Sequence, residues 1–239
     1  MFGIFSKTID SNFVEAAGLA GLDFIILDKE HGPVSDSMIH HHVRAAELSN
    51  LLSIVRVREC NEGEIGAALD AGAAGVQVPN ISSAVMAKKA VEAARFAPVG
   101  SRGVCRFVRD AKFGKKERQT YFKEANSKIV VLQVEGKEGV DAIDEIIAVK
   151  GYDVLFIGPY DLSQSLGIPG QVDHPDIFNL CKSLVKKAKV ANLRLGVFVD
   201  NLEQAEKYKM AGLTYIAYSV DVNLFQESIA KIVTDYSAL

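Results

Sequence analysis

The sequence predicts an α/β fold in which parallel strands alternate with helices and close into a single (β/α)8 TIM barrel over residues 1–239. A recurring unit supports this prediction. In it a helical segment ends at a glycine and a short apolar run follows at once, as in AGLDFIILD, AGAAGVQVP, VKGYDVLFIG and AGLTYIAYS. The glycine supplies the left-handed residue that ends a helix, and such apolar runs are typical of strands buried on both faces. No strand precedes a GxGxxG motif or a P-loop, which disfavours an open doubly wound sheet.

Eight candidate strands, one for each unit of such a barrel, follow one another along the chain. They lie at Gly3–Phe5, Phe24–Asp28, Leu52–Val57, Gly75–Pro79, Ile129–Glu135, Val154–Gly158, Leu195–Val199 and Tyr215–Val220. Between them, residues 36–48 place apolar side chains on one helix face, and residues 201–210 form a helix that Asp200 is expected to cap. The apolar C-terminal segment VNLFQESIAKIVTDYSAL is expected to form a last helix, which could pack on its own barrel as an ordinary eighth helix.

The composition excludes several functional classes. Hydrophobic residues make up 49% of the chain and charged residues 24%, which is typical of globular proteins. The formal net charge of −3 indicates no affinity for nucleic acid, and no apolar run approaches the roughly 20 residues that span a bilayer. The N-terminal segment lacks a signal-peptide pattern, so we expect a cytoplasmic protein. Cys60, Cys105 and Cys181 are too few and too far apart for a disulfide framework, and we expect reduced thiols.

One connection, residues 96–128, is unusually long and basic. It carries Arg102, Arg106, Arg109, Lys112, Lys115, Lys116 and Arg118. Loops of this length in compact domains are usually functional or mobile. Two interpretations carry equal weight: an active-site flap that holds an anionic substrate, with Arg106 and Arg109 as the candidate contacts, or a solvated charged face.

Two strands that run into acidic residues carry the strongest chemical signal. The fifth strand ends on Glu135, and the sixth stops at Gly158 and Pro159 just before Asp161. The active site of a TIM barrel lies at the C-terminal ends of its strands, so both carboxylates are expected at one rim. Oxygen ligands there would suit a hard cation such as Mg²⁺ or Mn²⁺. The alternative is that each acid merely begins the next helix, where negative charge is favourable.

Three other polar residues belong to the same rim. His31 is the natural general base because imidazole titrates near neutral pH, although a lone histidine is more often structural. Arg56 ends a buried strand and needs an anionic partner, either a structural carboxylate or a substrate carboxylate or enolate. Gln133 and Glu135 are two residues apart on one strand, so both are expected to point inward. The histidines at 40–42 cannot chelate one ion together, because successive helix residues diverge by about 100°.

Longer stretches extend this pattern over nearly the whole chain. They are LDKEHGPVSD, the arginine of VRVREC, AALDAGAAGVQVP, PVGSRGV, LQVEGKEGVDAID, FIGPYDLSQSLG, the HP pair that follows and YSVDVNLF. In this order they resemble the pyruvate-dependent class II aldolases of the HpcH/HpaI family, also called hydroxy-oxo-heptanedioate aldolases. FIGPYDLS with QVE upstream is the most specific part. The resemblance implies a barrel of the phosphoenolpyruvate/pyruvate type.

The resemblance implies a metal and an enolate site. Glu135 and Asp161 correspond to the two protein ligands of a divalent cation, Mg²⁺ or Mn²⁺ with Co²⁺ as a further option. Waters and the keto acid would complete its coordination. Arg56 corresponds to the residue that stabilises the oxygen of the pyruvate enolate. A Lewis acid of this kind requires no lysine Schiff base, so Lys29 need not be a nucleophile.

The resemblance also implies the acid/base and the substrate contacts. His31 corresponds to the acid/base and is paired with Asp70. Gln133 corresponds to a residue that positions water or ligand beside the metal. The amide that follows Pro159 would hold the pyruvate carboxylate, and Tyr160 stands where a small residue is common, so it is expected to narrow the substrate site.

The leading hypothesis is therefore a metal-dependent lyase that cleaves 4-hydroxy-2-oxo acids to pyruvate and an aldehyde. An oxaloacetate decarboxylase or an acyl-CoA lyase on the same scaffold is a close alternative, and a non-catalytic barrel that binds a small acid is a more distant one. The resemblance implies a homo-oligomer, a hexamer in which neighbours exchange the last helix.

Overall fold

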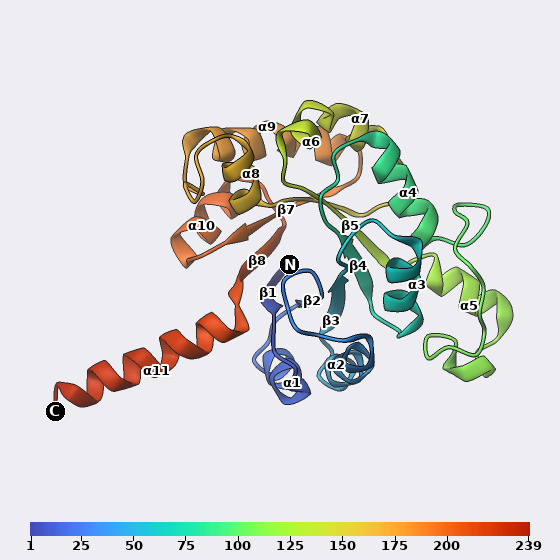
Figure 1. Cartoon of the computed structure of the whole chain (residues 1–239), viewed down its shortest axis with the longest axis horizontal. Helices are drawn as coiled ribbons and strands as arrows, with labels where there is room; N and C mark the ends of the chain where they lie inside the picture. Colours follow the sequence, from blue (N-terminus) through green and yellow to red (C-terminus); the bar gives the residue numbers. More distant parts are fainter.

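A computed structural model describes residues 1–239 as a closed barrel of eight parallel strands surrounded by helices (Figure 1). The strands follow one another around the barrel in chain order, and β1 closes the ring by pairing with β8. Their bounds are β1 Phe2–Ser6, β2 Phe24–Asp28, β3 Leu52–Arg56, β4 Gly75–Val78, β5 Ile129–Val134, β6 Val154–Ile157, β7 Arg194–Val199 and β8 Tyr215–Val220. The predicted fold class is confirmed, and every predicted strand is present.

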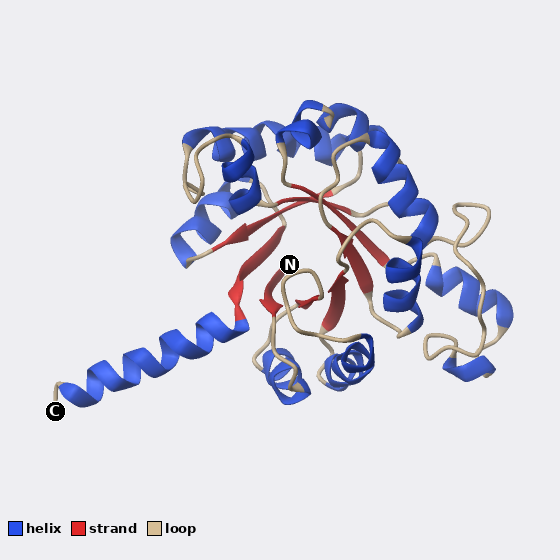
Figure 2. Cartoon of the chain, viewed as in Figure 1, coloured by secondary structure: helices blue, strands red, loops and turns tan.

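Helices cover most of the outer face of the strands, as Figure 2 shows. Their bounds are α1 Ser11–Leu19, α2 Asp36–Leu48, α3 Glu62–Asp70, α4 Ala84–Ala94, η1 Lys112–Gly114, α5 Arg118–Ala125, α6 Lys137–Asp141, α7 Ile143–Ala148, α8 Pro159–Ser165, α9 Pro175–Val190, α10 Leu202–Ala211 and α11 Asp221–Ser237. Several begin at a side-chain cap. At the start of α2 the hydroxyl of Ser35 accepts a hydrogen bond from the backbone N–H of Met38. At the start of α3 the amide oxygen of Asn61 accepts hydrogen bonds from the backbone N–H groups of Gly63 and Glu64.

The predicted cap of α10 is wrong by one residue. Asn201, with an extended backbone, is the cap, because its side-chain oxygen accepts a 2.9 Å hydrogen bond from the backbone N–H of Gln204. The carboxylate of Asp200 instead accepts a hydrogen bond from the hydroxyl of Tyr160. Both residues are good caps, and the tertiary partner of Asp200 decides between them.

The interior of the barrel is filled by side chains and is not a channel. Its buried cluster contains Phe5, Phe24, Ile26, Ile54, Val131, Val154, Phe156, Tyr215 and Ala217. The rings of Phe24 and Tyr215 stack with centroids 4.0 Å apart, and each large buried side chain stabilises the fold by roughly 1.5–3 kcal/mol. A Cβ on Gly3 would lie 2.2 Å from the carbonyl oxygen of Phe24, so the close packing there requires glycine. Phe5 and Phe156 form the floor on which the cavity described below rests.

The last helix, α11, extends away from the barrel (Figure 1). Asp221 at its start is its only buried residue, so it does not pack on its own barrel as an ordinary eighth helix. Its large exposed apolar side chains are Val222, Phe225, Ile229, Ile232, Val233 and Tyr236. None of the helices combines the length and the apolar character needed to cross a membrane.

Candidate active site

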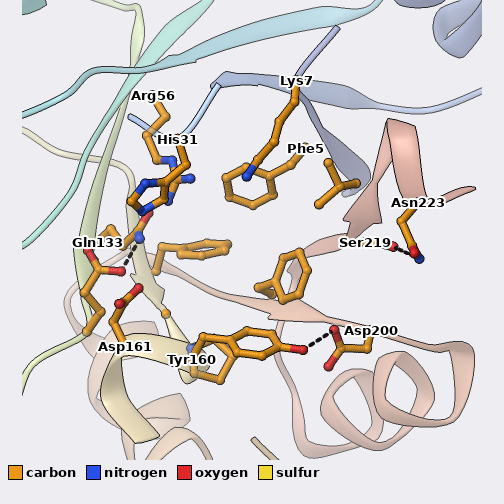
Figure 3. A pocket seen from close by; sticks show the side chains of 16 residues that line it. Phe5, Lys7, His31, Arg56, Gln133, Tyr160, Asp161, Asp200, Ser219 and Asn223 are labelled. Carbon is orange, nitrogen blue, oxygen red and sulfur yellow. Dashed lines mark hydrogen bonds between the residues drawn. The ribbon is translucent and has the colours of Figure 1, made fainter. Parts of the chain in front are cut away.

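A cavity of about 520 Å³ opens at the rim formed by the C-terminal ends of the strands (Figure 3). Seven predicted residues line it: His31, Arg56, Gln133, Glu135, Pro159, Tyr160 and Asp161. The other lining residues are Phe5, Lys7, Phe156, Gly158, Phe198, Asp200, Ser219, Val220 and Asn223. The structure therefore brings together all of the candidate residues except Asp70.

Arg56 is held by two carboxylates from the end of β2. Its Nε and Nη2 atoms donate to Asp28 Oδ1 and Oδ2 at 3.0 and 2.8 Å, and Nη1 lies 2.9 Å from Glu30 Oε2. The guanidinium also lies over the ring of Phe5, 4.8 Å from its centroid. The side chain is thus fixed with one edge toward the acids and with access to the cavity. Of the two partners expected for Arg56, a structural carboxylate or a substrate anion, the protein without substrate therefore supplies the structural carboxylate.

Asp28 organises the turn that carries His31. Its Oδ1 atom accepts hydrogen bonds from the backbone N–H groups of Glu30 and His31, at 3.0 and 3.2 Å. Burial alone would raise the pKa of Asp28, but the hydrogen bonds and the charge of Arg56 outweigh it and hold the pKa below its ordinary value. Asp28 is therefore an anion that positions Arg56 and the His31 backbone.

Gln133 and Glu135 lie on one face of the β5 end, as predicted. Gln77 on β4 donates to Gln133, and Gln133 donates in turn to Glu135 Oε2. The backbone N–H of Asn80 donates to Glu135 Oε1 at 2.9 Å. A Cβ on Gly158 would lie only 2.5 Å from Glu135 Oε2, so glycine leaves room for this carboxylate. The Glu135 side chain is therefore fixed from three directions.

Negative charge accumulates around Glu135. Burial, with the nearby charges of Glu30 and Asp161, raises the pKa of Glu135 to about 7. Asp161 stands in the first turn of α8 and faces the same cavity (Figure 3). The donors are oxygens only, which suits a hard divalent cation with waters and substrate oxygens as its other ligands. The structure contains no group of three or more His, Cys, Asp or Glu side chains placed to hold a metal ion.

Asp70 lies at the other end of the barrel from His31. It ends α3, which runs from the cavity rim back to the opposite rim, and its Oδ1 atom accepts a 2.5 Å hydrogen bond from Arg102. Arg102 in turn lies over the ring of Phe96, 4.7 Å from its centroid. The expected pair of His31 and Asp70 does not form within one chain.

The basic connection also lies at that opposite rim. Arg109 pairs with Glu47 on α2, and Arg106 donates to the carbonyl oxygens of Gly114 and Lys116. Within one chain these arginines stabilise the connection itself and do not reach the cavity. The interpretation of the connection as a flap over its own active site, with Arg106 and Arg109 as substrate contacts, is therefore wrong.

Lys29 and Tyr160 are oriented by ion pairs and hydrogen bonds. Lys29 is 1% exposed, and its Nζ lies 2.5 Å from Asp36 Oδ1 and 2.8 Å from Glu64 Oε2, outside the cavity. It is thus unavailable as a Schiff-base nucleophile. Tyr160 lines the cavity and donates to Asp200 at 2.9 Å. Burial, followed by this hydrogen bond, raises the pKa of Tyr160 to about 12, so the hydroxyl stays protonated.

Sequence reasoning did not single out three residues of the site. Lys7 follows β1, Glu30 precedes His31, and Gln77 occupies the middle of a buried strand. A polar residue inside an apolar strand was a usable signal for Gln77, because a buried amide needs a partner. Lys7 carried no such signal, since a lysine after a short strand is ordinarily solvated.

Comparison with known proteins gives one consistent result. The family model for HpcH/HpaI aldolase/citrate lyase matches residues 1–228. The 2-keto-3-deoxy-L-rhamnonate aldolase of Klebsiella pneumoniae is 33% identical over 231 residues, covering 96% of this chain and 86% of that protein. The crystal structure of an HpcH/HpaI aldolase/citrate lyase family protein from Burkholderia cenocepacia has a TM-score of 0.93 at 32% identity, covering 99% of this chain and 94% of that one. A citrate lyase β subunit from M. tuberculosis, solved with oxaloacetate and magnesium, shares the fold alone, with a TM-score of 0.60 at 15% identity over 92% of each chain.

Proposed function

Because the chain belongs to the HpcH/HpaI aldolase/citrate lyase family and is a lyase of the pyruvate aldolase type, we propose that it cleaves 4-hydroxy-2-oxo acids at the cavity above β2, β3, β5 and β6. This substrate class includes the 2-keto-3-deoxy sugar acid named for the Klebsiella pneumoniae relative. One observation carries the proposal: Glu135, Asp161, Arg56 and His31 line a single cavity. The chemistry requires all of these groups, and a binding role would not.

The metal ligands are Glu135 and Asp161. Glu135 follows β5, Asp161 lies in the first turn of α8 after β6, and both side chains line the same cavity. Burial together with nearby acids leaves Glu135 poorly stabilised as an anion without a cation. A divalent cation bound there would act as a Lewis acid on the keto oxygen of the substrate. Gln133 and the Asn80 amide hold Glu135 in place for that contact.

Arg56 stabilises the enolate. Cleavage of the bond between C3 and C4 of the substrate leaves an electron pair on C3 that spreads to the keto oxygen. Asp28 and Glu30 fix the guanidinium before substrate arrives, so its positive charge is already oriented where negative charge develops. The amide of Tyr160, which follows Pro159 at the start of α8, is the proposed contact for the pyruvate carboxylate.

His31 is the acid/base. In the cleavage direction a base takes the proton of the 4-hydroxyl group as the aldehyde forms, and a proton returns to C3 of pyruvate afterwards. The side chain of His31 lines the cavity and its backbone is fixed by Asp28. Since Asp70 lies at the opposite rim, a pair between His31 and Asp70 requires a second copy of the chain.

We also propose a homo-oligomer in which α11 packs on a neighbouring copy. The helix exposes a row of apolar side chains, and Phe2 on β1 is 37% exposed. Light scattering after size-exclusion chromatography tests this proposal. The double variant Phe225→Ser with Ile232→Ser should lower the molar mass, and an unchanged mass would contradict the proposal. Val190→Ser, exposed at the end of α9, is the control.

The test of the activity is pyruvate release from a panel of 4-hydroxy-2-oxo acids with Mg²⁺, Mn²⁺ or Co²⁺, and with a chelator. Release should depend on the metal and be lost in Glu135→Gln, which keeps the shape of the side chain and removes its charge. Glu145→Gln, the same change on the exposed face of α7, should retain activity. Release from oxaloacetate alone would favour the decarboxylase, release only from acyl-CoA thioesters the acyl-CoA lyase, and metal binding without any release the non-catalytic barrel.

A further inference from the structure

Lys7 presents to the cavity an ammonium group that has a distant ion-pair partner and no hydrogen bond. Its Nζ atom lies 3.8 Å from Asp28 Oδ2, an oxygen that already accepts a 2.8 Å hydrogen bond from Arg56. Lys7 Nζ makes no hydrogen bond to a protein acceptor, and its side chain is 33% exposed. Figure 3 shows the side chain pointing into the cavity across from Tyr160. All of its N–H donors are therefore free for a ligand.

The turn that carries Lys7 is held by a buried carboxylate from the other end of the chain. Asp221, 8% exposed at the start of α11, accepts hydrogen bonds from the backbone N–H of Lys7 at 3.0 Å and of Thr8 at 3.2 Å. It also accepts a 2.7 Å hydrogen bond from the hydroxyl of Ser6. The backbone of Lys7 is thus fixed before any ligand binds, which lowers the entropic cost of a contact to its side chain.

The position of Lys7 relative to Arg56 indicates which part of a substrate it meets. Both cations contact the same Asp28 oxygen, so they are neighbours on one wall of the cavity. In the proposed function Arg56 contacts the enolate oxygen of pyruvate, and the aldehyde carbon, C4 of the substrate, is bonded to the neighbouring C3. A group that the aldehyde carries on C4 would then lie beside Lys7. Nearby Ser219 and Asn223 are uncharged, and Asp200 across the cavity is already engaged by Tyr160.

We propose that Lys7 binds a carboxylate that the aldehyde partner carries next to its reacting carbon. The preferred aldehydes are then short oxo acids, and the substrate to be cleaved is a 4-hydroxy-2-oxo diacid. This inference rests on the proposed function and narrows its substrate class. Ammonium–carboxylate hydrogen bonds are among the stronger polar contacts in proteins, and a neutral aldehyde would leave Lys7 without a partner.

The experiment compares two aldehydes of equal length in the condensation with pyruvate: glyoxylate, which has a carboxylate, and glycolaldehyde, which has a hydroxymethyl group in its place. The measured quantity is the ratio of kcat/KM for glyoxylate to kcat/KM for glycolaldehyde. Lys7→Met should lower this ratio by on the order of 10- to 100-fold, the factor expected for one hydrogen bond to a charged group. Lys7→Arg should restore most of the ratio. Lys88→Met, at a side chain 72% exposed on α4, is the control for removing a lysine charge.

The ratio separates recognition from damage to the site. Any disturbance of Arg56 by the substitution would slow both aldehydes and leave the ratio unchanged. A ratio that does not move in Lys7→Met would overturn the inference and would mean that Lys7 only screens Asp28. A separate measurement, the metal-dependent exchange of the C3 protons of pyruvate with D₂O, reports enolate formation without any aldehyde. Its absence in the wild-type protein would overturn the proposed function and this inference together, whereas exchange with an unmoved ratio would overturn the inference alone.

Discussion

Replacing Arg56 with methionine separates the structural role of this side chain from its chemical one. Arg56 is 7% exposed, donates two hydrogen bonds to the fully buried Asp28 and forms an ion pair with Glu30. Methionine keeps most of the apolar stem and removes the charge. Asp28 would then keep only Lys7, at 3.8 Å, as a positive neighbour.

Two magnitudes follow from this geometry. Removing one partner of a buried ion pair leaves a buried charge uncompensated, so Arg56→Met should lower the free energy of unfolding by about 3–5 kcal/mol. Removing a donor oriented toward a developing oxyanion typically lowers kcat by about 10²–10³. Urea denaturation measures the first effect, and pyruvate release measures the second.

A second substitution distinguishes the two effects. In Arg56→Met with Asp28→Asn, the fully buried charge of Asp28 is removed together with its partner, and only the less buried Glu30 loses its cation. The amide oxygen of the introduced asparagine can still accept the backbone N–H groups of Glu30 and His31. The double variant should therefore regain much of the lost stability while pyruvate release stays low. If stability and pyruvate release both recovered, Arg56 would have no direct part in the reaction, and the proposed enolate contact would be refuted.

Three further predictions follow from particular contacts. Burial would raise the pKa of Asp28, but the hydrogen bonds and charge of its guanidinium partner hold it below its ordinary value. A carboxyl whose pKa is lowered by folding stabilises the protein at pH values above its unfolded pKa, and this stabilisation is lost as the pH is lowered further. In urea titrations at decreasing pH, the free energy of unfolding should therefore decrease in the acidic range, and it should decrease less steeply in Asp28→Asn. Gly158→Ala would place a Cβ 2.5 Å from Glu135 Oε2 and should weaken Mn²⁺ binding by calorimetry, whereas Gly66→Ala, with no atom within 4 Å, should not. Lys29 is paired outside the cavity, so treatment with pyruvate and borohydride should neither inactivate the protein nor label it. A pyruvyl adduct detected by mass spectrometry would contradict this prediction.

The sequence by itself determined the barrel and the rim that carries its chemistry. Apolar runs buried on both faces can only be parallel strands covered by helices, and eight of them in 239 residues close into a ring. All strands of such a ring end at one rim, so polar residues at strand ends meet without further information. Glu135, Asp161, Arg56 and His31 therefore line one cavity, as the sequence predicted.

The tertiary structure alone decided which neighbours these residues have. Whether Arg56 pairs with a protein carboxylate depends on the register between β2 and β3, which places Asp28 beside it. The orientation of Lys7 is fixed by Asp221, more than 200 positions away along the chain. Contacts of this kind depend on how distant segments pack, and local residue patterns carry no record of them.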